Sequence, residues 1–449
     1  MIKFRRVLAV LCFSLLLILV VGVTQKLFER KYSYSKYYDF YQQEEDFDVL
    51  FLGTSHVINA VYPMELWRGY GIVSFNMANH SENICTNYWQ LRNALQFTTP
   101  KVVVIDLYAV DGDSKVNEQY LHNFTDAMPF SMLKVKMVQD LLEPGKRMEY
   151  LFNLSLYHSR WEELGREDLK PGTGLEKGAE LREEVTVNVP PTLIPKEEYD
   201  PTDRLNKQYL QKIIDLCKEK KIEVVLMYIP YTMPEGDQQV ANWGYAAAEK
   251  NGIPYLNFVY EDLVINYATD CADEAHHLNA SGAKKVTAYL GDYITAHYEV
   301  EDHRAQSAYA FWHEDYEEYR RMKQEWLDGQ QNAWSYLMLL NDRDYQTKLY
   351  AAETSYIYQD PQMKELIGNI DVYGKVERLL PIVPAKLRMT IRSGLKSMMP
   401  QITRWSARGC WSAARKICMR CGEDWYIEKS LFIIEEMRLK CMYHHSCNA

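Results

Sequence analysis

An apolar run at positions 7–23 contains no charged residue, so it must be buried either in a membrane or in a protein core. Only Ser14 and Gly22 within the run are not strongly apolar, and a basic N-terminus precedes it. At about 1.5 Å of rise per helical residue, the run and its flanks are long enough to cross the apolar core of a bilayer. No small-x-small cleavage site follows, so we expect an uncleaved signal anchor rather than a cleaved signal peptide.

The charges around this anchor predict its topology. The basic N-terminus is expected to remain in the cytoplasm, although Lys26, Arg30 and Lys31 on the other flank weaken the bias. The chain is then a single-pass protein of the cell membrane whose C-terminal part is extracellular. Its formal net charge of −10 disfavours nucleic acid as a partner, because two acidic surfaces repel each other.

Beyond the anchor, short apolar runs alternate with segments of helical spacing. The runs are 48–53, 72–77, 102–107, 222–229 and 253–258, and the helical segments are 88–96, 204–220, 238–250 and 280–298. Strands that alternate with helices need crossover connections, which predicts a three-layer α/β fold with a parallel sheet covered on both faces. Ligands bind such sheets beyond the carboxyl ends of the strands, and residues 53–56 (Gly-Thr-Ser-His) are predicted at one such end.

Changes in composition divide the chain into domains. We expect a cytoplasmic N-terminus with a transmembrane anchor (1–25), a connector (26–47), a main α/β domain (48–300), a small α+β unit (305–375) and a basic, cysteine-rich, poorly ordered tail (376–449). The change in composition at the tail is sharp. It marks either a separate module or a region that is read out of frame relative to its ancestral sequence. Within the main domain, residues 110–199 interrupt the alternation and are interpreted as an insertion, either a lid over the site or a structural decoration.

Two segments combine residue types that perform acyl chemistry. Ser55 directly follows the first predicted strand, and residues 273–283 read Asp-Glu-Ala-His-His-Leu-Asn-Ala-Ser-Gly-Ala. Taken singly, each has a structural explanation, since Ser55 can cap the next helix and a lone histidine is usually structural. Taken together they supply a serine hydroxyl, an imidazole to remove its proton and a carboxylate to fix the imidazole tautomer.

The order and spacing of these segments resemble the SGNH/GDSL hydrolase family. The second segment is similar to the Asp-x-x-His-Leu-Asn-x-x-Gly-Ala form of membrane-anchored envelope members, which are alginate O-acetyltransferase-like and teichoic acid D-alanyl transfer protein-like. Over residues 45–300 the resemblance implies a flavodoxin-like parallel sheet, the SGNH hydrolase fold, with Ser55 as nucleophile and Asp273 and a histidine as its partners. The Asp-x-x-His spacing selects His276, whereas the Leu-Asn-x-x-Gly sequence that follows favours His277.

The glycine of the family's second motif and the Gly-x-Asn-Asp of its third have no clear counterpart in this chain. Asn79 or Asn83 is the candidate oxyanion donor beside the backbone N–H of Ser55, and His56 is a candidate substrate contact. Each also has a structural alternative, as a helix cap or as a residue that lines the turn.

A second group of candidate ligands lies in the tail. Cys418 and Cys421, followed by Cys441 and His444, have the i, i+3 spacing of structural zinc ligands. The exported location and the basic context favour incidental thiols instead, so we predict no metal and no other cofactor.

The resemblance therefore implies acyl transfer at the cell surface, in which an acyl group such as acetyl is loaded on Ser55 and passed to a hydroxyl of an envelope polysaccharide. Anchored members of this kind often work with a multi-spanning membrane O-acyltransferase that supplies the acyl group. A carbohydrate or lipid esterase of the same fold is one alternative. A non-catalytic glycan-binding protein that has kept the scaffold is another.

Overall fold

The computed structural model describes residues 2–29, 31–169, 174–261, 265–274 and 277–330, together with positions 335, 350–351, 361 and 380–381. The chain separates into two compact units. Unit 1 consists of Met1–Leu181, Pro191–Val264 and Ala283–Tyr316, and unit 2 of Arg182–Pro190, Ile265–Gly282 and Glu317–Ala449.

Unit 1 contains a five-stranded parallel sheet. Its strands are β1 (Val49–Leu52), β2 (Ser74–Asn76), β3 (Val102–Asp106), β4 (Glu223–Tyr228) and β5 (Tyr255–Asn257), in the order β2-β1-β3-β4-β5. Each apolar run predicted as a strand forms one, which confirms the α/β class. This is the flavodoxin-like strand order, in which ligands bind where the order reverses, between the ends of β1 and β3.

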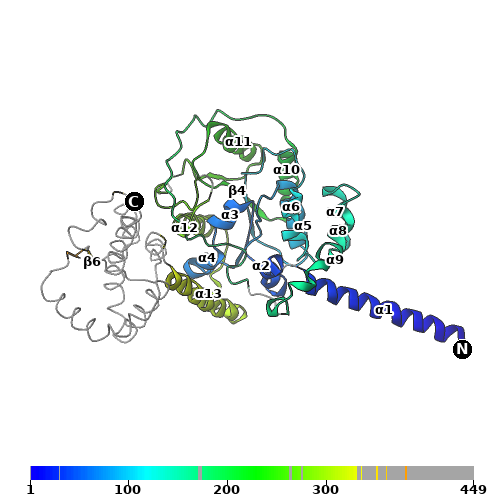
Figure 1. The fold of residues 1–449 in the computed structure, drawn as a ribbon. Helices are drawn as coiled ribbons and strands as arrows, with labels where there is room; N and C mark the ends of the chain where they lie inside the picture. Colours follow the sequence, from blue (N-terminus) through cyan, green and yellow to red (C-terminus); the bar gives the residue numbers. More distant parts are fainter. Residues whose placement is uncertain are drawn as a thin grey trace, which may run out of the picture. The chain divides into compact units, whose positions relative to one another are not determined.

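Helices cover both faces of this sheet. Figure 1 shows α5 (Ile84–Ala94) and α10 (Leu205–Lys220) on one side and α4 (Pro63–Tyr70) and α12 (Ala280–His297) on the other. Gln211 of α10 donates to Asn251 at 2.8 Å, which joins α10 to α11 (Glu235–Asn251). Tyr70 Oη donates to the carbonyl of Ala288 at 2.9 Å, which joins α4 to α12.

The central strands form because their residues are apolar on both faces. Every residue of β1 and β3 is buried, with the sequences Val-Leu-Phe-Leu and Val-Val-Val-Ile-Asp. Continuous apolar runs of this kind are typical of parallel strands that have helices on both sides. The exception is Asp106, whose carboxylate lies buried at the carboxyl end of β3.

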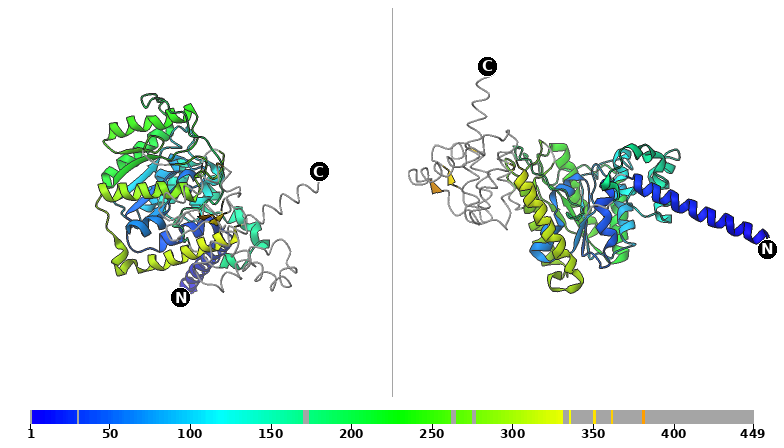
Figure 2. Two further views of the ribbon diagram at one scale, coloured as in Figure 1. Left: turned by 90° about the vertical axis from the view of Figure 1, so that its left-hand side faces the viewer. Right: turned by 60° about the horizontal axis from the view of Figure 1, so that its bottom comes forward.

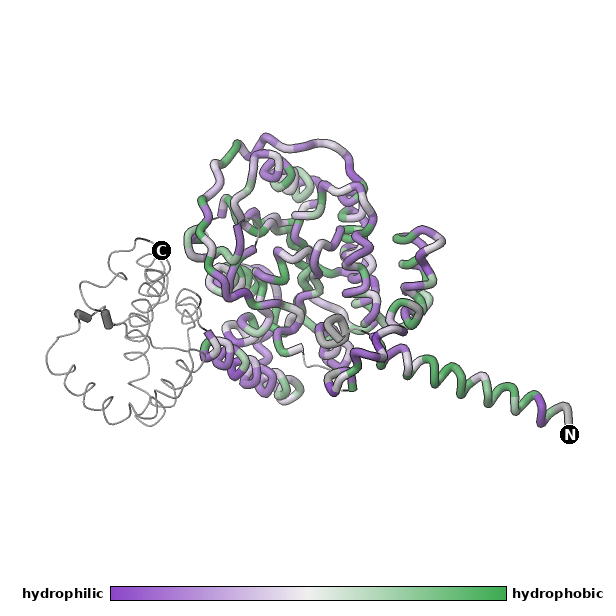
Figure 3. Tube along the Cα trace, in the orientation of Figure 1, coloured by the Kyte–Doolittle hydropathy of each residue, from purple (hydrophilic) through white to green (hydrophobic). Residues whose placement is uncertain are grey.

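The N-terminal helix α1 (Ile2–Phe28) differs from all the others. Its residues Phe4–Phe28 are long and apolar enough to cross a membrane, and its most apolar window has no buried side chain. Figure 3 shows this helix as hydrophobic along most of its length.

The segment expected to be a connector contains helix α2 (Lys31–Gln42). Tyr37 and Phe40 of α2 are buried, and their rings lie 6.0 and 5.2 Å from the ring of Phe75 in β2. This part of the chain therefore belongs to the core of unit 1. Because the sequence of this segment is acidic and rich in tyrosine, it did not indicate that one face of the helix is buried.

The remaining elements complete the described chain. They are α3 (Ser55–Ala60), α6 (Glu118–Thr125), α7 (Met132–Leu141), α8 (Arg147–Leu151), α9 (Leu154–Tyr157), the 3-10 helices η1 (His158–Glu162), η2 (Arg166–Leu169), η3 (His303–Ala305) and η4 (Ser307–Tyr309), helix α13 (Ala310–Gly329), and the two-residue strands β6 (Tyr350–Ala351) and β7 (Leu380–Pro381). Residues 305–330, the start of the expected small α+β unit, contain η4 and α13. Apart from positions 335, 350–351 and 361, the rest of that unit lies outside the described residues, as does the cysteine-rich part of the tail.

Candidate active site

Ser55 lies on a tight turn at the carboxyl end of β1. Gly53 has φ +154°, and a Cβ there would lie 2.5 Å from Cγ2 of Val57, so only glycine fits without a shift. Thr54 caps helix α3 by accepting a hydrogen bond from the backbone N–H of His56 at 3.3 Å. Ser55 is partly exposed, while the other residues of α3 are buried. The turn therefore presents the Ser55 residue at the edge of the sheet where ligands bind.

A buried polar cluster supports this turn from inside unit 1. The side-chain amide of Asn87 donates to the carbonyl of Gly53 at 3.4 Å and to Glu82 at 3.0 Å. Burial raises the pKa of Glu82 to about 8, so its carboxyl group is mostly neutral at pH 7. No sequence motif points to Asn87, and its contact with the Gly53 turn is seen only in the fold.

The two candidate oxyanion donors lie in the same unit with partners of their own. The amide of Asn79 is buried and donates to Tyr37 Oη at 2.7 Å. The amide of Asn83, which precedes α5, donates to the carbonyl of Ser114 at 2.9 Å. A role in an oxyanion hole remains a prediction for both residues.

His56 is enclosed by aromatic rings. Its imidazole stacks on Tyr108 with ring centroids 3.9 Å apart, and its centroid lies 5.2 Å from that of Tyr231. The side chain is buried, with 2% of its surface exposed. The structure therefore packs His56 beneath the turn, and a substrate contact by this residue stays a prediction.

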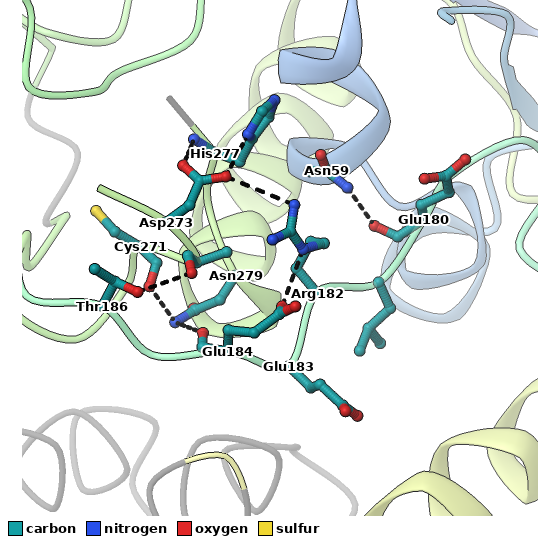
Figure 4. Close-up of polar contacts among 12 residues, drawn as sticks. Asn59, Glu180, Arg182, Glu183, Glu184, Thr186, Cys271, Asp273, His277 and Asn279 are labelled. Atoms are coloured by element: carbon teal, nitrogen blue, oxygen red, sulfur yellow. Dashed lines mark hydrogen bonds and ion pairs between the residues drawn. The ribbon is translucent and has the colours of Figure 1, made fainter. Parts of the chain in front are cut away.

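Asp273 and His277 form a directly bonded pair in unit 2 (Figure 4). Asp273 Oδ2 lies 2.6 Å from His277 Nδ1, and Oδ1 accepts a hydrogen bond from the His277 backbone N–H at 3.1 Å. The guanidinium of Arg182 lies 3.7 Å from the same carboxylate. A carboxylate on Nδ1 holds the proton there and leaves the lone pair on Nε2, which is the tautomer that a general base requires.

The backbone of the loop brings these two side chains together. The N–H of Ala272 donates to the carbonyl of His277 at 2.8 Å, and that of Asn279 donates to the carbonyl of Asp270 at 2.9 Å. These bonds close the loop, so Asp273 and His277 lie near its base. His276, the alternative base, lies outside the described residues.

Asn279 fixes the place where this loop enters α12. Its side-chain oxygen accepts hydrogen bonds from the N–H groups of Ser281 at 3.0 Å and Gly282 at 3.3 Å, which is N-cap geometry. Its amide group donates to the carbonyls of Thr269 at 2.8 Å and Cys271 at 3.2 Å. The Leu-Asn-x-x-Gly sequence is therefore explained locally, because one asparagine closes the loop and starts the helix.

A second segment that the sequence analysis missed borders the same loop. Thr186 donates through its N–H to the carbonyl of Cys271 and through its hydroxyl to that of Ala272, both at 2.9 Å. The amide of Asn188 donates to the carbonyl of Asp273 at 2.7 Å. The segment lies in a loop rich in Gly, Pro and Glu, where no periodicity points to such contacts.

The structure thus brings Asp273 and His277 together in unit 2, and it places Ser55, His56, Asn79 and Asn83 in unit 1. Cys418, Cys421, Cys441 and His444 lie outside the described residues. Among the candidates that the structure describes, the side chains of Asp273 and His277 are in direct contact.

No protein-family model matches this chain, and no curated protein matches it. Among solved structures, the chain is similar to a protein from Desulfitobacterium hafniense DCB-2 that is assigned to the G-D-S-L family of lipolytic proteins. The two share 12% sequence identity with a TM-score of 0.29, over 54% of this chain and 97% of that chain. The function of the site is therefore argued from its own geometry.

Proposed function

We propose that this chain is a serine esterase or acyltransferase in which Ser55 is the nucleophile, His277 the general base and Asp273 the group that orients the base. The observation that carries the proposal is the 2.6 Å contact between Asp273 and His277 Nδ1. It sets Nε2 as the proton acceptor, and an imidazole in that state is what a serine hydroxyl needs to become nucleophilic.

In the proposed reaction, Ser55 Oγ attacks the acyl carbonyl while its proton passes to His277 Nε2. The tetrahedral intermediate then collapses, the leaving oxygen takes that proton, and the acyl group remains on Ser55. An acceptor hydroxyl attacks the acyl-serine as its own proton passes to Nε2, and Ser55 Oγ recovers that proton as it leaves. The charge of Asp273 stabilises the imidazolium at each step, and Asn79 or Asn83 is the proposed oxyanion donor.

The acceptor that we propose is a hydroxyl of an envelope polysaccharide, which makes the protein a cell-surface acyltransferase. The apolar helix α1 supports a location at the membrane, and the basic residues before it favour an orientation with the chain beyond α1 outside the cell. A multi-spanning membrane O-acyltransferase is the proposed source of the acyl group. An esterase acting on carbohydrate or lipid differs only in that water attacks the acyl-serine.

A fluorophosphonate probe tests whether Ser55 is activated. The full-length protein should be labelled, and Ser55→Ala should abolish the labelling. Ser307→Ala is the matched control, because this exposed serine of unit 1 should not affect the reaction. Labelling that persists in Ser55→Ala would refute the assignment of the nucleophile, and a wild-type protein that never reacts would favour a glycan-binding protein.

His277→Ala and Asp273→Asn extend the same test to the base. If Ser55 works with this pair, each substitution should slow probe labelling by at least a hundredfold, since the hydroxyl would lose its proton acceptor. An unchanged rate of probe labelling would show that the Asp273–His277 pair does not activate Ser55. Incubation with an acetyl ester and a soluble oligosaccharide then measures how the acyl group divides between sugar and water.

A further inference from the structure

Exposed apolar side chains gather in one part of unit 1. In the described residues from 31 to 330, twelve large apolar side chains are exposed, and seven of them lie within residues 130–169. The six most exposed of the seven are Leu169 (73%), Met132 (70%), Phe130 (65%), Trp161 (65%), Met148 (61%) and Phe152 (48%). We call residues 130–169 the collar segment. Apolar groups gathered in this way usually mark a surface that is covered in the working protein.

The collar segment is attached to the C-terminal end of α1. Arg160 Nη1 donates to the backbone carbonyls of Phe28 at 2.6 Å and Glu29 at 2.7 Å, and the amide of Asn153 donates to the Glu29 carboxylate at 2.9 Å. Helices α9, η1 and η2 of the segment all contact α1. Figure 1 and the right view of Figure 2 both show the collar helices beside the base of α1. The segment and the end of α1 thus form one continuous surface.

This position coincides with the level at which α1 would leave a membrane. The span Phe4–Phe28 is about 37 Å long at 1.5 Å per residue, which exceeds the roughly 30 Å of hydrocarbon in a bilayer. Phe28, and the collar segment bound to it, would therefore lie in the interfacial region. Tryptophan and phenylalanine are favoured there, since their rings enter the headgroup and acyl boundary.

We propose that the collar segment inserts its apolar side chains into the outer surface of the bilayer that α1 crosses. The bilayer is the occupant because the patch is continuous with the membrane helix itself. Six Lys and Arg stand against seven Asp and Glu in residues 130–169, so attraction to anionic lipid is not the driving force. The segment should bind zwitterionic membranes through its apolar area. The inference rests on α1 being the membrane anchor.

Lipid cross-linking of the full-length protein tests this inference. The protein is reconstituted in phosphatidylcholine vesicles that contain phosphatidylcholine with a photoreactive diazirine near the headgroup, and labelled peptides are mapped by mass spectrometry. Label should appear on α1 and on peptides that contain Phe130, Phe152 or Trp161. Peptides with Leu193, which is 49% exposed beside α11, should remain unlabelled. Label on α1 without label on the collar segment overturns the inference, whereas absence from α1 as well refutes the anchor.

Substitutions on the collar surface provide the matched comparison. The triple variant Phe130→Ser, Phe152→Ser and Trp161→Ser should reduce collar labelling at least fivefold and leave the labelling of α1 unchanged. Unchanged collar labelling would contradict the proposal. Because three changes can disturb folding, the single variant Met132→Ser, at a side chain that is 70% exposed, should reduce label locally without a change in thermal unfolding. Leu193→Ser serves as the control substitution.

Discussion

His277 contacts the Asp273 carboxylate twice, through ring Nδ1 at 2.6 Å and through its own backbone N–H at 3.1 Å. One carboxylate therefore orients both the ring and the loop that carries it. Asn188 donates to the Asp273 carbonyl at 2.7 Å and holds the other side of the loop. Under the proposed function, these contacts would lower the free-energy cost of organising the site.

Asp273→Asn should reduce the rate of ester hydrolysis by about 10³–10⁴, because an amide favours the wrong imidazole tautomer and cannot stabilise the imidazolium. The kcat for a small acetyl ester, measured in detergent, checks this. Asp273→Glu keeps the charge and should retain more activity than the amide variant. Equal activity of the wild type and the amide variant would remove Asp273 from the mechanism.

Gly53→Ala should destabilise unit 1 by about 1–3 kcal/mol, since a Cβ at φ +154° would lie 2.5 Å from Val57 Cγ2 and strain the turn before Ser55. Urea unfolding measures the loss, and fluorophosphonate labelling should fall with it. Gly69→Ala in α4 is the matched control, because a Cβ there meets nothing within 4 Å. Equal stability of the two variants would contradict the assigned role of Gly53.

Asn279→Ala should weaken the loop of unit 2, because the cap of α12 and the donors to Thr269 and Cys271 are lost together. The loss of a cap alone typically costs about 1 kcal/mol, and carbonyls left without donors add to it. Asn279→Asp keeps the cap acceptor but not the amide donors, so its stability should fall between those of the wild type and the alanine variant. Hydrogen exchange of residues 265–282 measures the effect, and unchanged protection would contradict it.

Asp106 should make stability depend on pH. Burial raises its pKa to about 7, against an ordinary value of 3.8, so the folded state holds a proton that the unfolded chain releases. The stabilisation is complete below pH 3.8 and is lost as pH rises toward 7. At about 1.4 kcal/mol per pKa unit, the loss between pH 5 and pH 8 is up to about 3 kcal/mol.

Asp106→Asn should remove most of this dependence of the unfolding free energy on pH, as measured by urea unfolding at pH 5 and pH 8. The amide can still accept the hydrogen bond that Ile229 N–H donates to Asp106 at 3.1 Å. Asp215→Asn, at an exposed position of α10, should leave the pH dependence of the unfolding free energy unchanged. If the Asp106→Asn variant keeps the full pH dependence of the unfolding free energy, other titratable groups cause that dependence.

The sheet was predictable because buried parallel strands are apolar on both faces, so the runs that become β1 and β3 stand out without any periodicity. Strand ends differ from the predicted runs by at most two residues, as at the start of β2, because a side chain beyond the last ladder bond is equally apolar. Helix α2 was not predictable, since two buried rings, Tyr37 and Phe40, lie among polar residues. Their burial depends on Phe75, a partner distant in sequence.

Within the candidate site, the residues that bear chemistry were visible in the sequence and those that position them were not. Asp273 and His277 belong to one short segment, and the Leu-Asn-x-x-Gly sequence after His277 carried the signal for that histidine. Thr186 and Asn188 act on backbone carbonyls some 85 positions away, and such bonds leave no pattern of residue types. The preference for His277 over His276 is based on the sequence that follows it and stays a prediction, because His276 lies outside the described residues.

The hydrogen bonds from Arg160 to the carbonyls of Phe28 and Glu29, at the C-terminal end of α1, limit how the core of unit 1 can move relative to that helix. Two residues, Glu29 and Arg30, separate α1 from α2, and the ring of Tyr37 in α2 is part of the core. The core of unit 1, joined to α1 in this way, cannot move away from this helix as it could on a long flexible linker. Under the proposed function, this attachment would restrict the height above the lipid at which a polymer can reach Ser55, so acceptors would be selected by their position in the envelope as well as by their chemistry.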